Sequence, residues 1–288
     1  WLFANANNTP RVARINLSTF KTDEILELPN SGGNHSSPFI TENTEYVVAG
    51  TRFSVPMGDQ QDVPISSYKE NFHGTVSFIG VDPKSGRMHL AFQLMLPPVD
   101  FDLSHAGKGP SRDWFFFSTY NTEQAHTLLE VNASPRDKDF IMAVNWKKAE
   151  EYARQGKGVK QKKAYVHNIY DERTHTASST MESDVLVLDP KQLKDVVYFI
   201  PCPKSPHGCD VDPTGEYIVG SGKLAALIPV FSFSKIQKAI ADKNFEGDYE
   251  GIPVIKYEAA LHGEVKKPGL GPLHTEFDSR GNAYTSFF

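Results

Sequence analysis

The chain of 288 residues is poor in cysteine and has no long hydrophobic run. Its two cysteines, Cys202 and Cys209, match no zinc or redox spacing and cannot form a disulfide framework, so we expect buried free thiols. The longest nearly unbroken apolar run, Leu224 to Phe233, is far shorter than the roughly 20 residues that a membrane-spanning helix needs. These absences argue against a disulfide scaffold and against a helical membrane span.

Charge and motif content exclude further classes. The net charge is −5 without a basic stripe, so no nucleic-acid partner is expected, and the basic cluster Lys157 to Lys163 is interpreted as a solvated loop. No glycine-rich loop links a strand to a helix, and no Gly-x-Ser-x-Gly motif is present. The carboxylate pair Glu150 and Glu151 is expected to be solvated on a helix face.

What the sequence does contain is a series of short segments with strand character. They are β-branched or aromatic and are bounded by Asp, Pro, Gly and Asn turns such as Asp82-Pro-Lys-Ser-Gly86. A parallel α/β fold would need helices between most of them, and these are missing. The pattern predicts an all-β protein of the β-propeller class, with strands at 11–17, 23–28, 45–49, 75–81, 87–96, 114–119, 140–144, 184–188, 196–200, 216–219 and 252–257.

Two segments have helical spacing, Asn145 to Gly156 and Ser234 to Asn244, the second with Ser234 as its expected N-cap. We expect both to be short insertions on the outside of the sheet array. The polar stretch Gly156 to Ser183 is predicted to be a long loop. No domain boundary is evident, so residues 1–288 are treated as one partial propeller domain.

The ends of the chain suggest an internal fragment. It begins at Trp1 without an initiator Met or a signal-like segment, and it stops at Phe288 inside an expected strand. Ending in mid-strand would leave ladder groups unpaired, so we expect further blades on both sides.

Three histidines head the same local unit. His207 and His274 each precede a short segment, an Asp-x-x-Gly turn and a strand that begins at a tyrosine, and His35 repeats the pattern with a weaker turn. Related units around an axis would bring these imidazoles together. Imidazole binds copper, zinc, iron and nickel, and an all-histidine set favours copper. The alternative is that each histidine hydrogen-bonds within its own blade, and the other seven histidines share no such frame.

A second candidate site has oxygen ligands. Tyr120-Asn-Thr-Glu123 and Arg136-Asp137 collect such ligands within a short stretch of sequence. Surface loops contain these residues routinely, so on its own this is a weak calcium signal.

With these residues in view, the chain resembles the catalytic propeller of the nitrous oxide reductase family. The resemblance rests on three blocks: Pro203-Lys-Ser-Pro-His-Gly-Cys209, Gly222-Lys-Leu224, and the long block Gly269-Leu-Gly-Pro-Leu-His274 that continues to Tyr284. The opening residues Phe3 to Ile15 and the block Tyr120 to Glu123 also fit. Matches run from end to end and are looser at 97–114 and 156–183.

The resemblance implies a seven-bladed propeller, of which about five blades would be present here. In the family, axial histidines hold a tetranuclear copper-sulfide cluster that reduces nitrous oxide to dinitrogen and water in the last step of denitrification. It further implies a periplasmic head-to-tail homodimer, a C-terminal cupredoxin domain with a dinuclear copper site, and electron transfer from a small c-type cytochrome or cupredoxin. Without the flanking blades and the cupredoxin domain, the isolated fragment should be inactive.

Carried over by position, the resemblance implies His35, His207 and His274 as copper ligands, and Asp102 as an orienting group for a histidine. It implies a calcium site made of the Tyr120 backbone, the Glu123 and Asp137 side chains and the Ser205 carbonyl. The alternative function is a non-enzymatic propeller that acts as a binding module with blade-internal histidines. Further axial histidines and a Cys/His/Met copper motif in the flanking sequence would distinguish the two.

Overall fold

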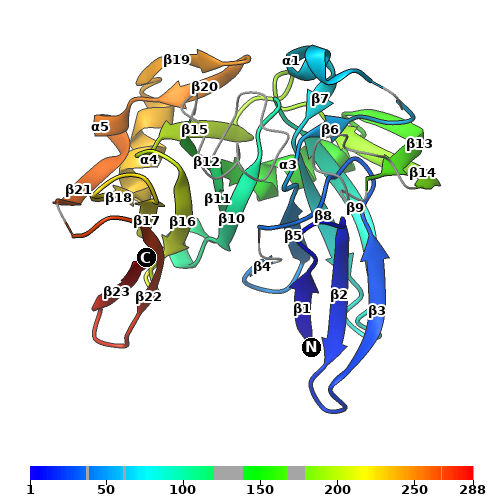
Figure 1. Ribbon diagram of the computed structural model, residues 1–288, viewed down its shortest axis with the longest axis horizontal. Helices are drawn as coiled ribbons and strands as arrows, with labels where there is room; N and C mark the ends of the chain where they lie inside the picture. Colours follow the sequence, from blue (N-terminus) through cyan, green and yellow to red (C-terminus); the bar gives the residue numbers. More distant parts are fainter. Residues whose placement is uncertain (37–38, 61–62, 120–138, 168–178, 267, 288) are drawn as a thin grey trace.

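The computed structural model describes residues 1–288 except 37–38, 61–62, 120–138, 168–178, 267 and 288. The described chain is mostly β-strand, and its sheets are arranged as propeller blades, so the predicted fold class is confirmed (Figure 1). Four sheets form the blades, and one further hairpin follows them. The expected number of about five blades is reached only if the hairpin is counted as the start of a fifth blade. No helix in the described part of the chain is long and apolar enough to cross a membrane.

The first two blades come mainly from the N-terminal half, and the second gains two strands, β13 and β14, from later in the sequence. The first is a three-stranded sheet in the order β1-β2-β3, with β1 Leu2–Asn5, β2 Arg11–Asn16 and β3 Lys21–Glu27. The second has the order β13-β14-β9-β8-β5-β4, with β4 Phe39–Ile40, β5 Tyr46–Gly50, β8 Thr75–Val81, β9 Met88–Met95, β13 Val159–Val166 and β14 Ser179–Leu188. A small hairpin inserted between β5 and β8 pairs β6 Val55–Pro56 with β7 Phe72–His73.

The third and fourth blades carry the central and C-terminal sequence. The third has the order β10-β11-β12-β15-β20-β19, with β10 Phe101–Ala106, β11 Trp114–Thr119, β12 Phe140–Asn145, β15 Val197–Pro201, β19 Phe245–Tyr249 and β20 Ile252–Ile255. The fourth has the order β16-β17-β18-β21, with β16 Pro206–Val211, β17 Tyr217–Gly222, β18 Leu227–Ser232 and β21 Leu261–Lys266. The last hairpin pairs β22 Pro272–Phe277 with β23 Ala283–Phe287.

The predicted loop at Gly156 to Ser183 is wrong where the structure describes it. Residues Val159–Val166 form β13, which pairs antiparallel with β14, and β14 in turn runs parallel to β9. β13 is the edge of its six-stranded sheet, and its lysines are exposed. Lysines on an edge strand discourage pairing with other chains, and the same residues weaken the strand signal in the sequence.

The two predicted helical insertions are present as α3 Trp146–Arg154 and α4 Phe233–Ala241. Asn145 caps α3 by accepting from the amide of Lys148. The N-cap of α4 is Ser232, not Ser234 as predicted. The remaining short elements are α1 Tyr68–Asn71, α5 Tyr257–Ala260, and 3-10 turns at Ile65–Ser67 and Gly109–Ser111.

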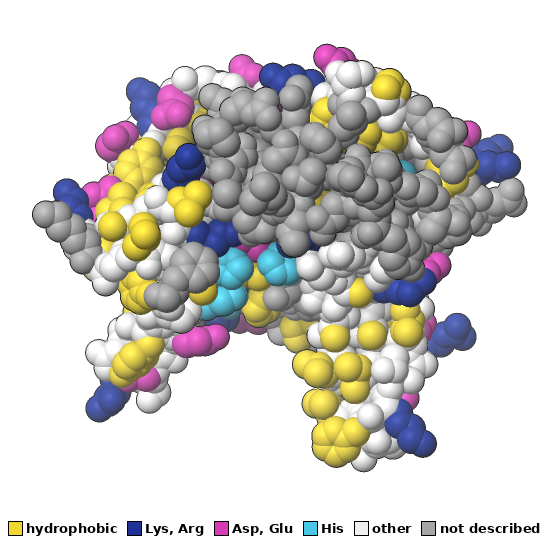
Figure 2. Space-filling model, viewed as in Figure 1, with side chains coloured by type: hydrophobic (Ala, Val, Ile, Leu, Met, Phe, Trp, Pro, Cys, Tyr) yellow, Lys and Arg dark blue, Asp and Glu magenta, His cyan; other side chains and the backbone are white. Residues whose placement is uncertain are grey.

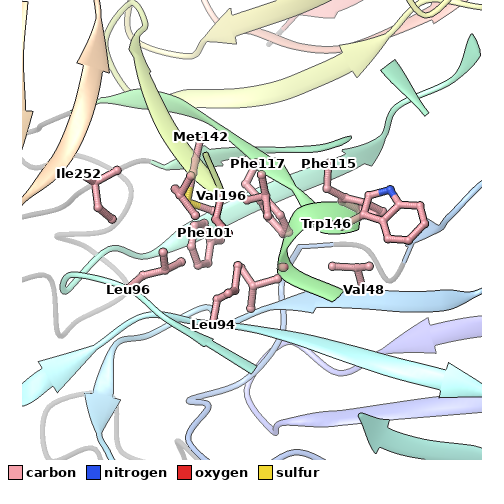
Figure 3. Packing of buried hydrophobic residues seen from close by; sticks show 14 of the residues in the cluster. Val48, Leu94, Leu96, Phe101, Phe115, Phe117, Met142, Trp146, Val196 and Ile252 are labelled. Carbon is pink, nitrogen blue, oxygen red and sulfur yellow. The ribbon is translucent and has the colours of Figure 1, made fainter. Parts of the chain in front are cut away.

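The core lies between neighbouring blades. One buried cluster joins the second and third blades through Val48, Leu94, Phe101, Phe117 and Trp146, so α3 contributes its buried face to this seam (Figure 3). A second cluster packs α4 against the third and fourth blades. Each large side chain buried in these seams contributes roughly 1.5–3 kcal/mol relative to exposure. This packing fixes where the first strands of successive blades meet.

Candidate functional site

The three sequence-predicted histidines lie close together. His207 is on β16 and His274 on β22, and their ring centroids are 4.9 Å apart. His35 precedes β4, and its ring centroid is 6.2 Å from that of His207. Figure 2 shows histidine side chains gathered at the head of a hollow between the sheet β1–β3 and the hairpin β22–β23. Segments far apart in sequence thus supply neighbouring imidazoles.

Asp102 on β10 joins two of these histidines. Its Oδ2 is 2.5 Å from Nδ1 of His207, and its Oδ1 is 2.6 Å from Nδ1 of His35. Asp102 is 1% exposed, and its Oδ2 also accepts a hydrogen bond from Nζ of Lys223 at 3.2 Å. A carboxylate accepts hydrogen bonds only, so His207 turns its Nδ1–H to Asp102 and keeps Nε2 as the nitrogen that can bind a metal, while Nδ1 of His35 lies at ion-pair distance from the other carboxylate oxygen.

The charge of Asp102 is fixed by these contacts. Burial alone would raise the pKa of its carboxyl, but the hydrogen bonds from His207 and His35 and the nearby Lys223 ammonium hold that pKa well below its ordinary value. The buried group is therefore an anion that is compensated by a cation on a neighbouring blade.

His274 is oriented differently. Its Nδ1 is 3.9 Å from Oδ1 of Asp210, an ion-pair distance rather than a hydrogen bond. The Asp210 carboxylate raises the pKa of His274, whose side chain is half exposed. Asp210 is held in turn, because its Oδ2 accepts the amide of Thr275 at 2.6 Å. The backbone of β22 is thereby tied to β16.

A shared β-bulge explains how β10, β16 and β22 present these residues. In each strand two residues face a single residue of the next strand: Asp102–Leu103, His207–Gly208 and Leu273–His274. A bulge interrupts the regular alternation of side chains along a strand and changes the direction in which the bulged side chains point. Asp102 therefore occupies the place in its blade that His207 occupies in the next one. The histidine-based sequence pattern did not detect the third blade, because that blade has an aspartate, Asp102, at the position of the histidine.

His35 is held by loop contacts instead. The amide of Gly32 donates to Oγ1 of Thr51 at 2.9 Å, and Ser36 Oγ both donates to the Gly50 carbonyl and accepts its amide. Gly33 has φ +80, and a Cβ there would collide with the carbonyl of Asn7, so this position needs glycine.

Of the predicted calcium ligands, Tyr120, Glu123 and Asp137 lie outside the described residues. Ser205 is buried, with φ +56, and its carbonyl accepts the amide of Lys223 at 2.9 Å. Its amide donates to Oδ2 of Asp139 at 2.8 Å. Asp139 and Lys223 therefore support the segment that leads into His207, and sequence reasoning gave neither of them a role.

Within the described ranges, no group of three or more His, Cys, Asp or Glu side chains is arranged to hold a metal ion by itself. Cys202 and Cys209 are free thiols there, Cys209 buried and Cys202 half-buried. Burial raises the pKa of both thiols.

The sequence comparison finds similarity over the full length of the chain. The chain is 28% identical over 289 aligned residues to the nitrous-oxide reductase of Pseudomonas fluorescens, and 29% identical over 289 to that of Stutzerimonas stutzeri. The chain resembles nitrous-oxide reductase from end to end. Both alignments cover 100% of the chain and 40% of the relative, so the chain spans well under half the length of these nitrous-oxide reductases.

Two further comparisons add less. No family model matches the chain. Among solved structures, the hydrazine synthase of Kuenenia stuttgartiensis aligns with a TM-score of 0.55 at 11% identity, covering 98% of the chain and 66% of that protein. At this identity the likeness concerns the fold alone, whereas the likeness to nitrous-oxide reductase concerns the sequence.

Proposed function

We propose that the chain is part of a copper-dependent nitrous oxide reductase, and that His35, His207 and His274 are copper ligands. The observation that carries this proposal is the shared contact of Asp102 with Nδ1 of His35 and His207. An imidazole that binds a metal through one nitrogen commonly donates a hydrogen bond from its other N–H group to a carboxylate. Imidazole is also a good ligand for copper. The donor set therefore fits the metal that the similar proteins imply.

The described residues would prepare the site as follows. Asp102 fixes the tautomer of two imidazoles, so that their Nε2 lone pairs face outward from the carboxylate. Lys223 balances the Asp102 charge. Copper held by these residues would relay two electrons from an external donor protein and act as a Lewis acid in the reduction of nitrous oxide, an inert molecule, which with two protons gives dinitrogen and water.

The wider assignment rests on the resemblance. It includes a tetranuclear copper-sulfide cluster completed by histidines outside this chain, a calcium site near Ser205, and a dinuclear copper site in a cupredoxin domain. It also includes a periplasmic head-to-tail homodimer that receives electrons from a small c-type cytochrome or cupredoxin. On this proposal residues 1–288 form a single partial propeller domain that does not turn over alone.

The second candidate is a non-enzymatic propeller with blade-internal histidines. This alternative assumes that each histidine bonds to a group in its own blade. His207 and His35 instead contact Asp102 on the third blade, which argues against it at these two positions. The His274 imidazole also faces a carboxylate outside its own hairpin, Asp210 on β16, but at 3.9 Å this is too long for a hydrogen bond, so His274 does not separate the two functions.

The test is the copper content of the chain extended through its native flanks and expressed with copper available. We expect copper well above that of a His274→Ala variant, together with nitrous oxide consumption under a reducing dye. His89→Ala serves as the matched control, because His89 is an exposed histidine on β9. Equal, near-zero copper in the folded wild type and in His274→Ala would favour the scaffold.

A further inference from the structure

The three bulged hairpins share one more feature, a serine opposite the bulge. Ser118 on β11, Ser221 on β17 and Ser286 on β23 each face the two bulged residues of the preceding strand. Ser118 and Ser221 are fully buried. The same residue type therefore recurs at the point where the sheet ladder is interrupted.

A bulge leaves backbone groups without their regular ladder partners, and a hydroxyl can serve them because it both accepts and donates. Ser118 Oγ accepts the amide of Leu103 at 3.0 Å and donates to the carbonyl of His207 at 2.6 Å. The first bond closes the bulge that carries Asp102, and the second crosses to the next blade. Ser286 Oγ likewise accepts the amide of His274 at 3.3 Å.

We propose that Ser118 is a positioning residue for the metal site. It ties the Asp102 bulge to the backbone of His207, and so sets the distance between the carboxylate and the imidazole that it orients. Ser286 acts on the His274 backbone in the same way. This inference rests on the proposed function, since it assumes that His207 binds copper.

The experiment compares full-length wild type, Ser118→Ala and Ser118→Thr, each expressed with copper. Ser77→Ala is the control, because Ser77 is a buried serine on β8 that accepts a hydrogen bond from Gln93 and lies outside the three hairpins that carry Asp102, His207 and His274. Electron paramagnetic resonance of the bound copper reports ligand geometry independently of turnover. Hydrogen exchange of the metal-free protein reports the amides of 101–106.

We expect Ser118→Ala to exchange the 101–106 amides about tenfold or more faster, because the Leu103 amide loses its buried acceptor. Its copper signal should broaden or shift, Ser118→Thr should restore both readouts, and Ser77→Ala should leave both unchanged. A wild-type copper signal retained unaltered in Ser118→Ala, or unchanged exchange, overturns the inference and leaves the proposed function standing. Absence of copper from folded wild type overturns both.

Discussion

Asp102 is the residue on which the candidate site depends most. It is buried and contacts two histidines and a lysine, each from a different segment of the chain. Removing its charge would take from the buried Lys223 ammonium its contact with this carboxylate, and would free both imidazoles to rotate.

We predict that Asp102→Asn in the full-length protein lowers copper affinity by about 10- to 100-fold, the range seen when a group that orients a metal ligand is lost. It should also destabilise the fold by about 3 kcal/mol or more, because one partner of a buried ion pair is neutralised. Copper titration and urea unfolding measure the two effects. Undiminished copper affinity would argue against the orienting role.

A second carboxyl nearby responds to pH. Asp100 is fully buried, and its Oδ1 accepts the amide of Ser54 at 2.7 Å. Burial raises the pKa of Asp100 to about 8, above the value of about 3.9 expected in the unfolded chain. The folded state therefore retains this proton where the unfolded state has lost it.

Because the folded pKa is the higher one, the stability contributed by protonated Asp100 is fully present below about pH 4 and is lost as pH rises through about pH 8. We predict that wild type loses stability between about pH 5 and pH 8 more steeply than Asp100→Asn, which cannot ionise. Urea unfolding across this interval measures the slopes. Equal slopes would show that Asp100 is not the responsible group.

At the scale of elements, α3 is fastened to the second blade by a carboxylate that the sequence suggested was solvated. Glu150 is only 5% exposed, and it accepts hydrogen bonds from Tyr46, Lys147 and Arg154. Its neighbour Glu151 is exposed and pairs only with Lys148 among the described residues. The pair Glu150 and Glu151 thus splits into one buried and one solvated group.

We predict that Glu150→Ala destabilises the protein by about 1–3 kcal/mol, because the Tyr46 hydroxyl loses its acceptor on the buried face of α3. Glu151→Ala is the matched control, and should change stability by less than about 0.5 kcal/mol. Chemical unfolding of the two variants compares them directly. Equal effects would mean that the contact with Tyr46 adds nothing.

At the scale of the whole molecule, the first blade has an apolar face that no described element covers. The strand register places Leu2, Ala4, Ala13 and Ile25 on one face, with Leu2 50% and Ile25 59% exposed. The opposite face, with Val12 and Leu26, packs into the core. Figure 2 shows apolar side chains on this projecting part of the molecule.

Exposed apolar sheet faces drive association. We therefore predict that the chain 1–288, prepared alone, associates as its concentration rises, and that Leu2→Lys combined with Ile25→Lys reduces this without lowering the melting temperature. Phe20→Lys is the control, because Phe20 is 83% exposed but lies in the turn after β2 rather than on this face. Analytical ultracentrifugation measures the association, and no difference between the double variant and the control would contradict the prediction.

The sequence by itself determined the local elements. The strands at 75–81 and 114–119 are formed as predicted, α3 and α4 lie within about two residues of their predicted starts, and the histidine-headed units fold as hairpins closed by the Asp212 and Asp278 turns. Hydrophobic periodicity, caps and turn residues act over a few positions, so a linear pattern records them. The recurring spacing from histidine to tyrosine within each unit also pointed to a common position for the three histidines.

Only the tertiary structure decided which groups meet. The bond between His207 and Asp102 spans 105 residues, and the one between Lys223 and Asp102 spans 121. The burial of Glu150 and the edge strand β13 likewise depend on how one blade packs against another. No local pattern encodes such distances, because blade packing and the shared bulge set them, and these arise only after the strands have paired and their seams have closed.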